Sequence, residues 1–398
     1  MENSRLNHFV GIAMLLGLIV PHTSIFLMAI NPVLAVLLFI FVGSNVNRGF
    51  GVTKFLISVV VLVSLISSAL FLFHDSDKYI LSSVFFMMLI LLFPFVGRQR
   101  IPNIYYFIAI GIILFSQLVY LFNMPSIQRI IETLYPVSET DLNSFEYMTE
   151  NINSGNIFGF RLGGIFRNAN QSARYTSLIT AAYLADRPNE NMRKTGLLVL
   201  LALGSVLFTG SRTGLAVITL IILLFFLRNN SIKKSSKIIL TAIVVAFVIP
   251  IFIGGSQIIR GFNINQGFND SAIVKLDVFR NYLSQDNSFF HLLFGYCDTK
   301  TFQPSRFGIM SIFDSEYGDL IYSFGFLGFV LVISFYIKSV RICQKENRLF
   351  FVILLWSITS TVLMSYRMSF LFMLFLSHFV SLKQEKIIQP IKDSVFKR

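Results

Sequence analysis

The chain has 398 residues, of which 55% are hydrophobic and only 13% are charged. A soluble globular domain carries about 25% charged residues, so this composition excludes a soluble protein built around one core. It predicts an all-α protein that crosses a membrane many times. The formal net charge of +13 would suit nucleic acid. The basic residues follow a membrane pattern instead, so we expect no nucleic-acid partner.

Apolar stretches that could cross a bilayer recur along the whole chain. A span needs about 20 apolar residues, or somewhat fewer where helices thin the bilayer locally. The stretches are 7–23, 25–42, 55–73, 79–96, 104–121, 173–185, 195–209, 213–227, 238–254, 320–337, 349–364 and 369–381. The sequence therefore predicts a polytopic membrane protein with about 12 transmembrane helices. The first two stretches could also be one long helix with a kink at Pro21.

Lysine and arginine are concentrated at both termini and in alternate loops. These loops contain Arg48 and Lys54, Arg98 and Arg100, Arg187 to Lys194, Arg228 to Lys237, and Lys338 to Arg348. Cytoplasmic loops are enriched in Lys and Arg, so we place both termini in the cytoplasm and the opposite loops outside. Two outer loops are much longer than the rest, and long loops in compact proteins are usually functional or disordered.

The span pattern divides the chain into five segments. They are N-terminal transmembrane helices (1–121), a first large periplasmic loop (122–172), central transmembrane helices (173–254), a second large periplasmic loop (255–319), and C-terminal transmembrane helices with a cytoplasmic tail (320–398). Aromatic residues in the two loops, among them Tyr135, suggest folded caps. The cytoplasmic loops are short and contain no P-loop pattern, so we expect chemistry outside, without ATP or another cofactor.

Cysteine and histidine give no sign of a metal site. Cys297 and Cys343 fall on opposite sides of the predicted membrane, so they cannot pair. No cluster of His, Cys and Asp has the spacing of zinc ligands. His291 lies in the second long outer loop, and a lone histidine is more often structural than catalytic. We therefore assign no metal.

The outer side keeps arginine although lysine is scarce there. The outer arginines are Arg129, Arg161, Arg167, Arg174, Arg212, Arg260, Arg280, Arg306 and Arg367. A guanidinium group binds phosphate or carboxylate through two parallel hydrogen bonds and keeps its proton. Arg174, Arg212 and Arg367 fall at or just inside span ends, where a cation needs an anionic partner or a water-filled cavity. Alternatively, each arginine snorkels to lipid phosphates.

The stretch TGSRTG, residues 209–214, places Arg212 at the start of the predicted span 213–227. A helix start favours a bound anion. Small residues stand on both sides of Arg212, as close approach of the backbone to a ligand would require. Arg212 is therefore the leading candidate for a phosphate ligand among the outer arginines.

Two other polar stretches precede predicted spans. In NANQSAR, Asn168 and Asn170 could cap a helix or hydrogen-bond sugar hydroxyls or a phosphate. In IFDSEYGD, Asp314 and Glu316 could supply a general base for a hydroxyl group. Asp319, in the same stretch, suits a helix N-terminus equally well.

Four motifs occur in a fixed order between about residues 150 and 335. They are GGIFRNANQSA, TGSRTGL, VKLDVFRNYL followed by LFGYC, and SEYGDLIYSFGFLGF. With these motifs and two large outer loops, the chain resembles the O-antigen ligase and polymerase superfamily of bacterial polysaccharide assembly. The resemblance implies transfer of a glycan from undecaprenyl diphosphate to a hydroxyl group at the outer face of the inner membrane. Polymerases use a second lipid-linked repeat unit as acceptor, and ligases use lipid A-core.

The resemblance also implies roles for single residues. Arg212 matches the family's Ser-Arg motif and would bind the diphosphate. Lys275 stands where the family commonly has Arg, and Arg280 follows shortly after it, so either could take a phosphate role. Asp314 occupies the place of the ligases' catalytic His, which favours a polymerase and makes Asp314 the candidate base, with Glu316 as its rival.

The sequence thus predicts an O-antigen or capsule-type polysaccharide polymerase whose active face is periplasmic. Arg212 and Arg174, with Lys275 or Arg280, would hold the donor diphosphate. Further substrate contacts are expected from Arg167, Asn168, Asn170, Arg367 and His291. The expected partners are an undecaprenyl-diphosphate-linked oligosaccharide, membrane lipid and a chain-length regulator. A ligase, a lipid-linked glycan flippase or transporter, and a structural membrane subunit are the alternatives.

Overall fold

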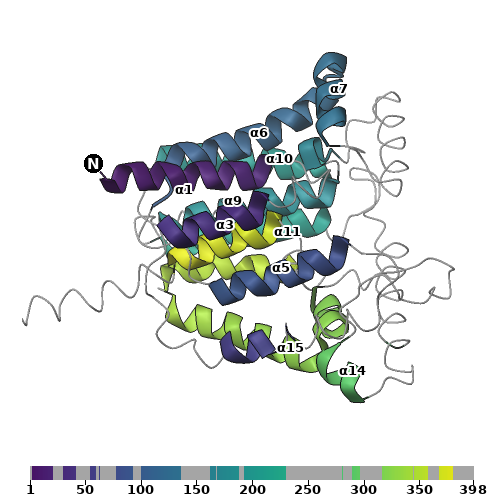
Figure 1. Cartoon of the computed structure of the whole chain (residues 1–398). Helices are drawn as coiled ribbons and strands as arrows, with labels where there is room; N and C mark the ends of the chain where they lie inside the picture. Colours follow the sequence, from purple (N-terminus) through teal and green to yellow (C-terminus); the bar gives the residue numbers. More distant parts are fainter. Residues whose placement is uncertain are drawn as a thin grey trace, which may run out of the picture.

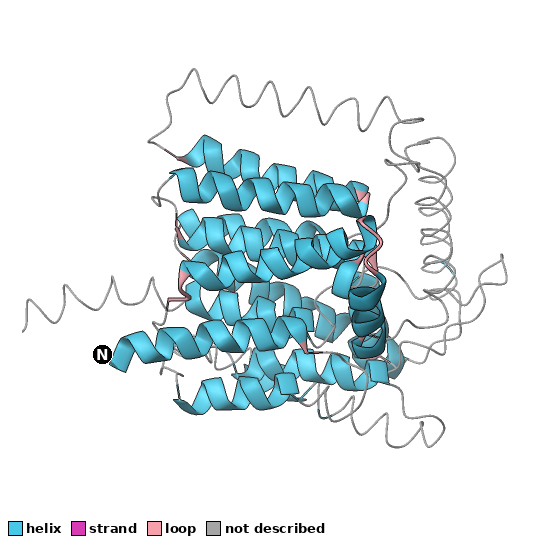
Figure 2. Cartoon of the chain, turned by 90° about the horizontal axis from the view of Figure 1, so that it is seen from above, coloured by secondary structure: helices cyan, strands magenta, loops and turns pink. Residues whose placement is uncertain are grey.

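The structure is a computed structural model that describes residues 2–20, 30–41, 54–59, 62, 78–92, 100–135, 162–166, 168–187, 192–229, 280, 289–295, 316–343, 345–356 and 367–379. These residues form helices and short connections, and no strand occurs among them (Figure 2). The expected all-α class is therefore confirmed for the described part of the chain.

The long helices run side by side in one bundle (Figure 1). The α-helices are α1 (Glu2–Ile19), α3 (Ile30–Phe41), α5 (Lys78–Leu92), α6 (Asn103–Leu121), α7 (Pro125–Leu134), α9 (Ala169–Asp186), α10 (Met192–Thr209), α11 (Arg212–Arg228), α14 (Phe289–Phe294) and α15 (Glu316–Ile342). Two 3-10 helices are η1 (Gly164–Phe166) and η3 (Glu346–Leu355). A last helix, Arg367–Phe379, follows η3.

Three helices are long and apolar enough to cross a membrane by length and composition, namely α6, α10 and the Leu320–Ile342 part of α15. Shorter apolar helices cover Arg5–Ile19, Thr213–Arg228 and Arg367–Phe379. These helices indicate a membrane protein. The number of about 12 spans and the two large outer loops stay predictions, because the stretch 238–254 and most of both loops lie outside the described residues.

The first two predicted spans are two separate helices. α1 and α3 are in contact and lie side by side (Figure 1). Pro32 falls in the first turn of α3, where a residue without an N–H group is tolerated because that group has no partner within the helix. The alternative of one long kinked helix is therefore wrong.

The predicted span 349–364 differs from expectation in its local geometry. Its described part belongs to η3, a 3-10 helix of 10 residues, whereas 3-10 segments longer than about four residues are uncommon. A 3-10 helix rises about 2.0 Å per residue, compared with 1.5 Å in an α-helix. η3 therefore reaches further into the bundle than an α-helix of the same length, and Trp356 follows at its end.

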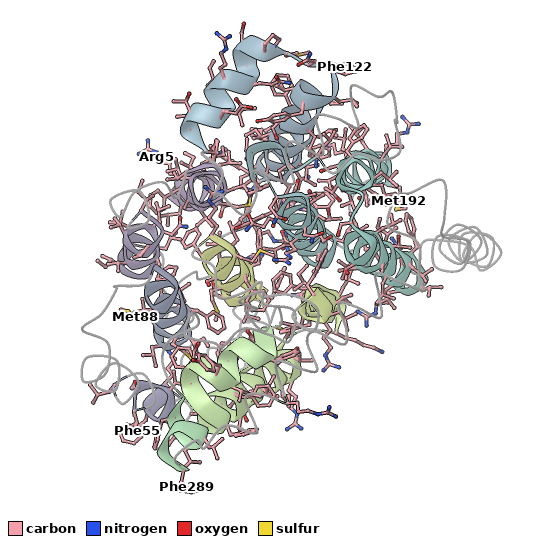
Figure 3. The ribbon with its side chains drawn as sticks, turned by 90° about the vertical axis from the view of Figure 1, so that its right-hand side faces the viewer. Arg5, Phe55, Met88, Phe122, Met192 and Phe289 are labelled. Atoms are coloured by element: carbon pink, nitrogen blue, oxygen red, sulfur yellow. The ribbon has the colours of Figure 1, made fainter. Side chains whose placement is uncertain are left out.

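Two helices form the centre of the bundle. Every residue of the helix Arg367–Phe379 is buried, and so is every residue of α9 from Ser172 onward except Arg174. Figure 3 looks along the bundle and shows the helix Arg367–Phe379, in yellow-green, with other helices around it. A helix buried on all sides must be apolar around its whole circumference. The sequence MSFLFMLFLS between Arg367 and His378 meets this requirement.

α15 is kinked where it meets α14. Gly325 has φ +65 inside α15, and a Cβ atom added there would fall into the backbone of Leu293. Gly295 has φ +79, and a Cβ atom there would meet the backbone of Ser323. Since only glycine combines a positive φ with the absence of a side chain, these two positions allow the backbones of α14 and α15 to touch.

We expect Gly325→Ala to destabilise the protein, because alanine would bring both strain at positive φ and a clash with the backbone of Leu293. The strain alone costs about 1–3 kcal/mol. Gly111→Ala is the matched control, since a Cβ atom at Gly111 meets nothing within 4 Å and alanine favours a helix interior. Thermal unfolding of the purified protein in detergent compares the two. Equal unfolding temperatures would contradict the close backbone contact.

Candidate functional site

The bundle has two polar ends, which differ in how their charges are paired. At one end Nε2 of His378 lies 2.8 Å from Oδ1 of Asp186, and both side chains are buried. Arg187, the next residue, donates from Nη2 to the carbonyl oxygen of Ile101 at 2.8 Å. These contacts join the end of α9, the end of the last helix and the segment before α6. We call this the Asp186 end.

The Asp186 end also contains the beginning of α1. The backbone N–H of Arg100 donates to Oδ1 of Asn7 at 2.9 Å, and Nδ1 of His8 lies 3.0 Å from the hydroxyl of Tyr105. The first residues of α1 and α6 therefore lie together. Loops rich in Lys and Arg are predicted on this side, so it corresponds to the predicted cytoplasmic side.

At the opposite end, Arg367 begins the last helix and is buried among aromatic rings. Its Cζ lies 5.6 Å from the ring centre of Tyr135 and 5.8 Å from that of Phe166. Only 8% of Arg367 is exposed, and its Nε atom makes no hydrogen bond within the described residues. Cation–π contacts offset part of the cost of burial. The guanidinium group therefore keeps N–H donors with which it can bind an anion. We call this the Arg367 end.

Tyr135 joins three elements at the Arg367 end. It follows α7, its hydroxyl donates to the carbonyl oxygen of Ile19 at the end of α1, and its ring faces Arg367. Burial raises the pKa of the Tyr135 hydroxyl, while the Arg367 cation acts in the opposite direction. The phenol therefore stays neutral near pH 7 and remains a hydrogen-bond donor.

Arg174 approaches the same end from another side of α9. Its Cζ lies 5.5 Å from the ring centre of Trp356. The neighbouring Tyr175 stacks on Phe166 with ring centres 4.2 Å apart and an angle of 6° between the planes. Phe166 in turn contacts Arg367. Two guanidinium groups thus lie beside the first turns of α9, where the helix dipole favours anions.

A glutamine lies below these arginines inside the bundle. Nε2 of Gln117 in α6 has three oxygen acceptors, which are Ser172 Oγ at 2.9 Å, the Ser205 carbonyl at 3.1 Å and the Leu162 carbonyl at 3.3 Å. Thr176 and Ser205 also lie within hydrogen-bond distance, at 3.1 Å. This network links α6, α9 and α10. The signal in the sequence was one amide within an apolar span, which usually faces the interior of a bundle.

The TGSRTG stretch forms the turn before α11. Gly210 has φ +57, and Oγ of Ser211 accepts a hydrogen bond from the Gly214 N–H at 3.2 Å as the helix cap. A Cβ atom added at Gly214 would lie 2.7 Å from Cβ of Ala173 in α9. These glycines therefore serve the turn and the packing of α11 on α9, rather than approach to a ligand. Arg212 is the first residue of α11, and its side chain lies outside the described residues.

Asn168 caps α9. Its Oδ1 accepts hydrogen bonds from the backbone N–H groups of Asn170 at 2.9 Å and Gln171 at 3.3 Å. Asn170 lies half-buried in the first turn. Of the two readings of NANQSAR, the capping role is therefore the one observed for Asn168. Arg167 lies outside the described residues.

The other candidate residues are described only in part. Lys275 and Asp314 lie outside the described residues, and Arg280 is exposed. Glu316 is the first residue of α15 and His291 belongs to α14, although their side chains are not described. α14 and α15 are in contact and lie together in Figure 1. Two helices that carry candidate residues are thus neighbours.

The fold and the site together define a helical membrane protein with a buried arginine, Arg367, at one end of its bundle. A scan against protein-family profiles finds no match for the chain, and a search of curated proteins finds none either. The resemblance to the O-antigen ligase and polymerase superfamily therefore depends on the four motifs. Glycines of these motifs lie against other motifs in the structure. Gly214 of the second motif packs on Ala173 of the first, and Gly325 of the fourth packs on the LFGYC segment of the third.

We expect Asp186→Leu to destabilise the protein by about 1–3 kcal/mol, because it leaves a buried histidine without its acceptor. The double variant Asp186→Leu, His378→Leu replaces both partners by apolar groups and should lose less stability than the single variants Asp186→Leu and His378→Leu combined. Thermal unfolding of all four proteins in one detergent measures the coupling. Strictly additive losses would show that the hydrogen bond contributes nothing.

Proposed function

We propose that the protein is a polysaccharide polymerase of the outer face of the inner membrane. It would transfer a glycan from undecaprenyl diphosphate to a hydroxyl group of a second lipid-linked repeat unit. The observation that supports this best is Arg367, a buried guanidinium whose Nε makes no hydrogen bond to any described residue, at the end opposite to the predicted cytoplasmic side. Such a group suits a phosphate-bearing substrate, because the cost of its burial is recovered when an anion pairs with it.

The arrangement of the helices supports a diphosphate leaving group. α9 and α11 both begin at the Arg367 end and pack together through Ala173 and Gly214, so two helix N-termini lie close to one another. Arg174 and Arg367 add positive charge there, and Arg212 starts α11. As the bond from the anomeric carbon to the diphosphate breaks, negative charge grows on the diphosphate oxygens. Guanidinium groups already in place stabilise that charge without rearrangement.

A carboxylate would complete the reaction. In the proposal, Asp314 or Glu316 takes the proton from the acceptor hydroxyl while its oxygen forms the new bond to the anomeric carbon. The diphosphate leaves from the opposite face of the sugar ring with the bonding electron pair. Glu316 is placed at the start of α15, on a helix that contacts α14.

This direct displacement inverts the configuration of the anomeric carbon. The linkage in the polymer should therefore have the opposite anomeric configuration to the sugar–diphosphate bond of the donor, and nuclear magnetic resonance of both species measures it. Retained configuration would require a covalent glycosyl intermediate and would rule out the single-step reaction.

We expect Arg367→Gln and Arg212→Ala to lower polymer formation about 100-fold or more, as removal of one donor to a developing oxyanion does. Glycan ladders from a deletion strain that carries each variant, at matched membrane levels, measure the effect. Arg129→Ala is the matched control, because Arg129 is an exposed arginine of α7. Arg367→Lys keeps the charge but loses the planar fork, and it separates loss of binding from loss of folding.

The banding pattern also distinguishes the alternatives. Core lipid with a single repeat unit and no ladder identifies a polymerase. Core lipid without any repeat, together with long lipid-linked chains, identifies a ligase. A full ladder in Arg367→Gln and Arg212→Ala would show that these arginines are not part of the active site.

A further inference from the structure

α7 is an amphipathic helix that begins directly after a candidate membrane span. α6 ends at Leu121, and α7 covers Pro125–Leu134. The chain turns sharply between them, so that α7 extends across the end of α6 (Figure 1). Its position at the end of a 19-residue candidate span places it where the membrane surface must be.

Hydrogen bonds and packing fix α7 to the bundle along one side. Nε2 of Gln128 donates to the carbonyl oxygen of Val119 in α6 at 3.2 Å. Ile131 is buried, and Tyr135 at the end of the helix is held by Ile19 and Arg367. α7 is therefore an anchored part of the structure and not a free arm.

The apolar face of α7 is wider than the part that the bundle covers. Residues three and four positions apart lie on one face of a helix, so Ile127, Ile130, Ile131 and Leu134 form one continuous apolar face. Ile131 is buried and Ile127 half-buried, but Ile130 is 57% exposed and Leu134 is 48% exposed. On the opposite flank lie the exposed Arg129 and the half-buried Glu132.

We propose that α7 lies in the plane of the outer face of the membrane that the bundle spans, and that it inserts Ile130 and Leu134 among the lipid chains. The geometry has the features of an interfacial helix: one side packs on the protein, one flank is apolar and the opposite flank is polar. Phe122, which is 65% exposed and lies at the outer edge of the bundle (Figure 3), extends the apolar surface toward α6. Lipid is the occupant, because the surface continues the lipid-facing side of a membrane span.

The proposal has a consequence for the depth of the site. Tyr135 directly follows α7, and its ring contacts Arg367. If α7 lies at the boundary between head groups and lipid chains, Arg367 lies close to the level of the lipid phosphates. The inference does not depend on the proposed polymerase activity, because it rests on the exposure and position of α7 alone.

Fluorescence quenching in reconstituted vesicles tests this placement. The full chain with Cys297→Ser would carry one new cysteine, either Ile130→Cys or Leu134→Cys on the apolar flank, or Arg129→Cys on the polar flank. Cys343 is buried, and the parent without a new cysteine serves as the blank. Each protein is labelled with an environment-sensitive dye in phosphatidylethanolamine–phosphatidylglycerol vesicles, and is quenched with lipids brominated in the acyl chain or with aqueous iodide.

We expect brominated lipid to quench dyes at 130 and 134 at least threefold more strongly than a dye at 129, and iodide to show the reverse order. Similar quenching on both flanks by either agent would overturn the proposal. Protection of positions 130 and 134 from both quenchers would also overturn it, because another part of the protein would then cover the apolar flank. All three positions are exposed, so that the substitutions should leave folding intact, and size-exclusion chromatography checks this.

Discussion

Two helices without a lipid-facing or water-facing side, α9 and Arg367–Phe379, determine how the rest of the molecule is arranged. Because they are buried along almost their whole length, polar groups are tolerable only where they are paired or near the helix ends. One pair of ends is joined by Asp186 and His378. The other pair carries Arg174 and Arg367, which face aromatic rings. The surrounding helices complete the burial of these two.

This division of charge gives the Arg367 end its chemical character. At the Asp186 end, a carboxylate balances the histidine and the adjacent Arg187. At the Arg367 end, the ring contacts of the buried guanidinium within the described part of the chain are Tyr135 and Phe166, which supply π-electrons but no full negative charge. Aromatic rings hold a cation in place without neutralising it. The end therefore holds a cation in a fixed position without a full counter-charge from these rings, which is the property that the proposed transfer from a diphosphate requires.

The motif glycines have a structural role that fixes the position of the segments carrying the candidate site residues. Gly214, Gly295 and Gly325 each mark a place where two helices or their ends touch. The segments that carry Arg212, His291 and Glu316 are positioned by these contacts, since α11 packs on α9 and α14 on α15. In each motif the glycine allows two backbones to lie close together. This contact also fixes the position of the candidate charged residue near the glycine.

The sequence by itself determined the helical class, the approximate helix positions and the segregation of arginine to span ends, because these follow from local hydropathy and charge. It could not tell which helices are central, since a lipid tail and a buried side chain are equally apolar neighbours. The rings of Tyr135 and Phe166 meet Arg367 across more than 200 residues of chain, and no local pattern records such a contact. The 3-10 form of η3 and the separation of α1 from α3 were likewise decided by packing. The tertiary structure thus decided which of the many arginines is buried at the candidate site.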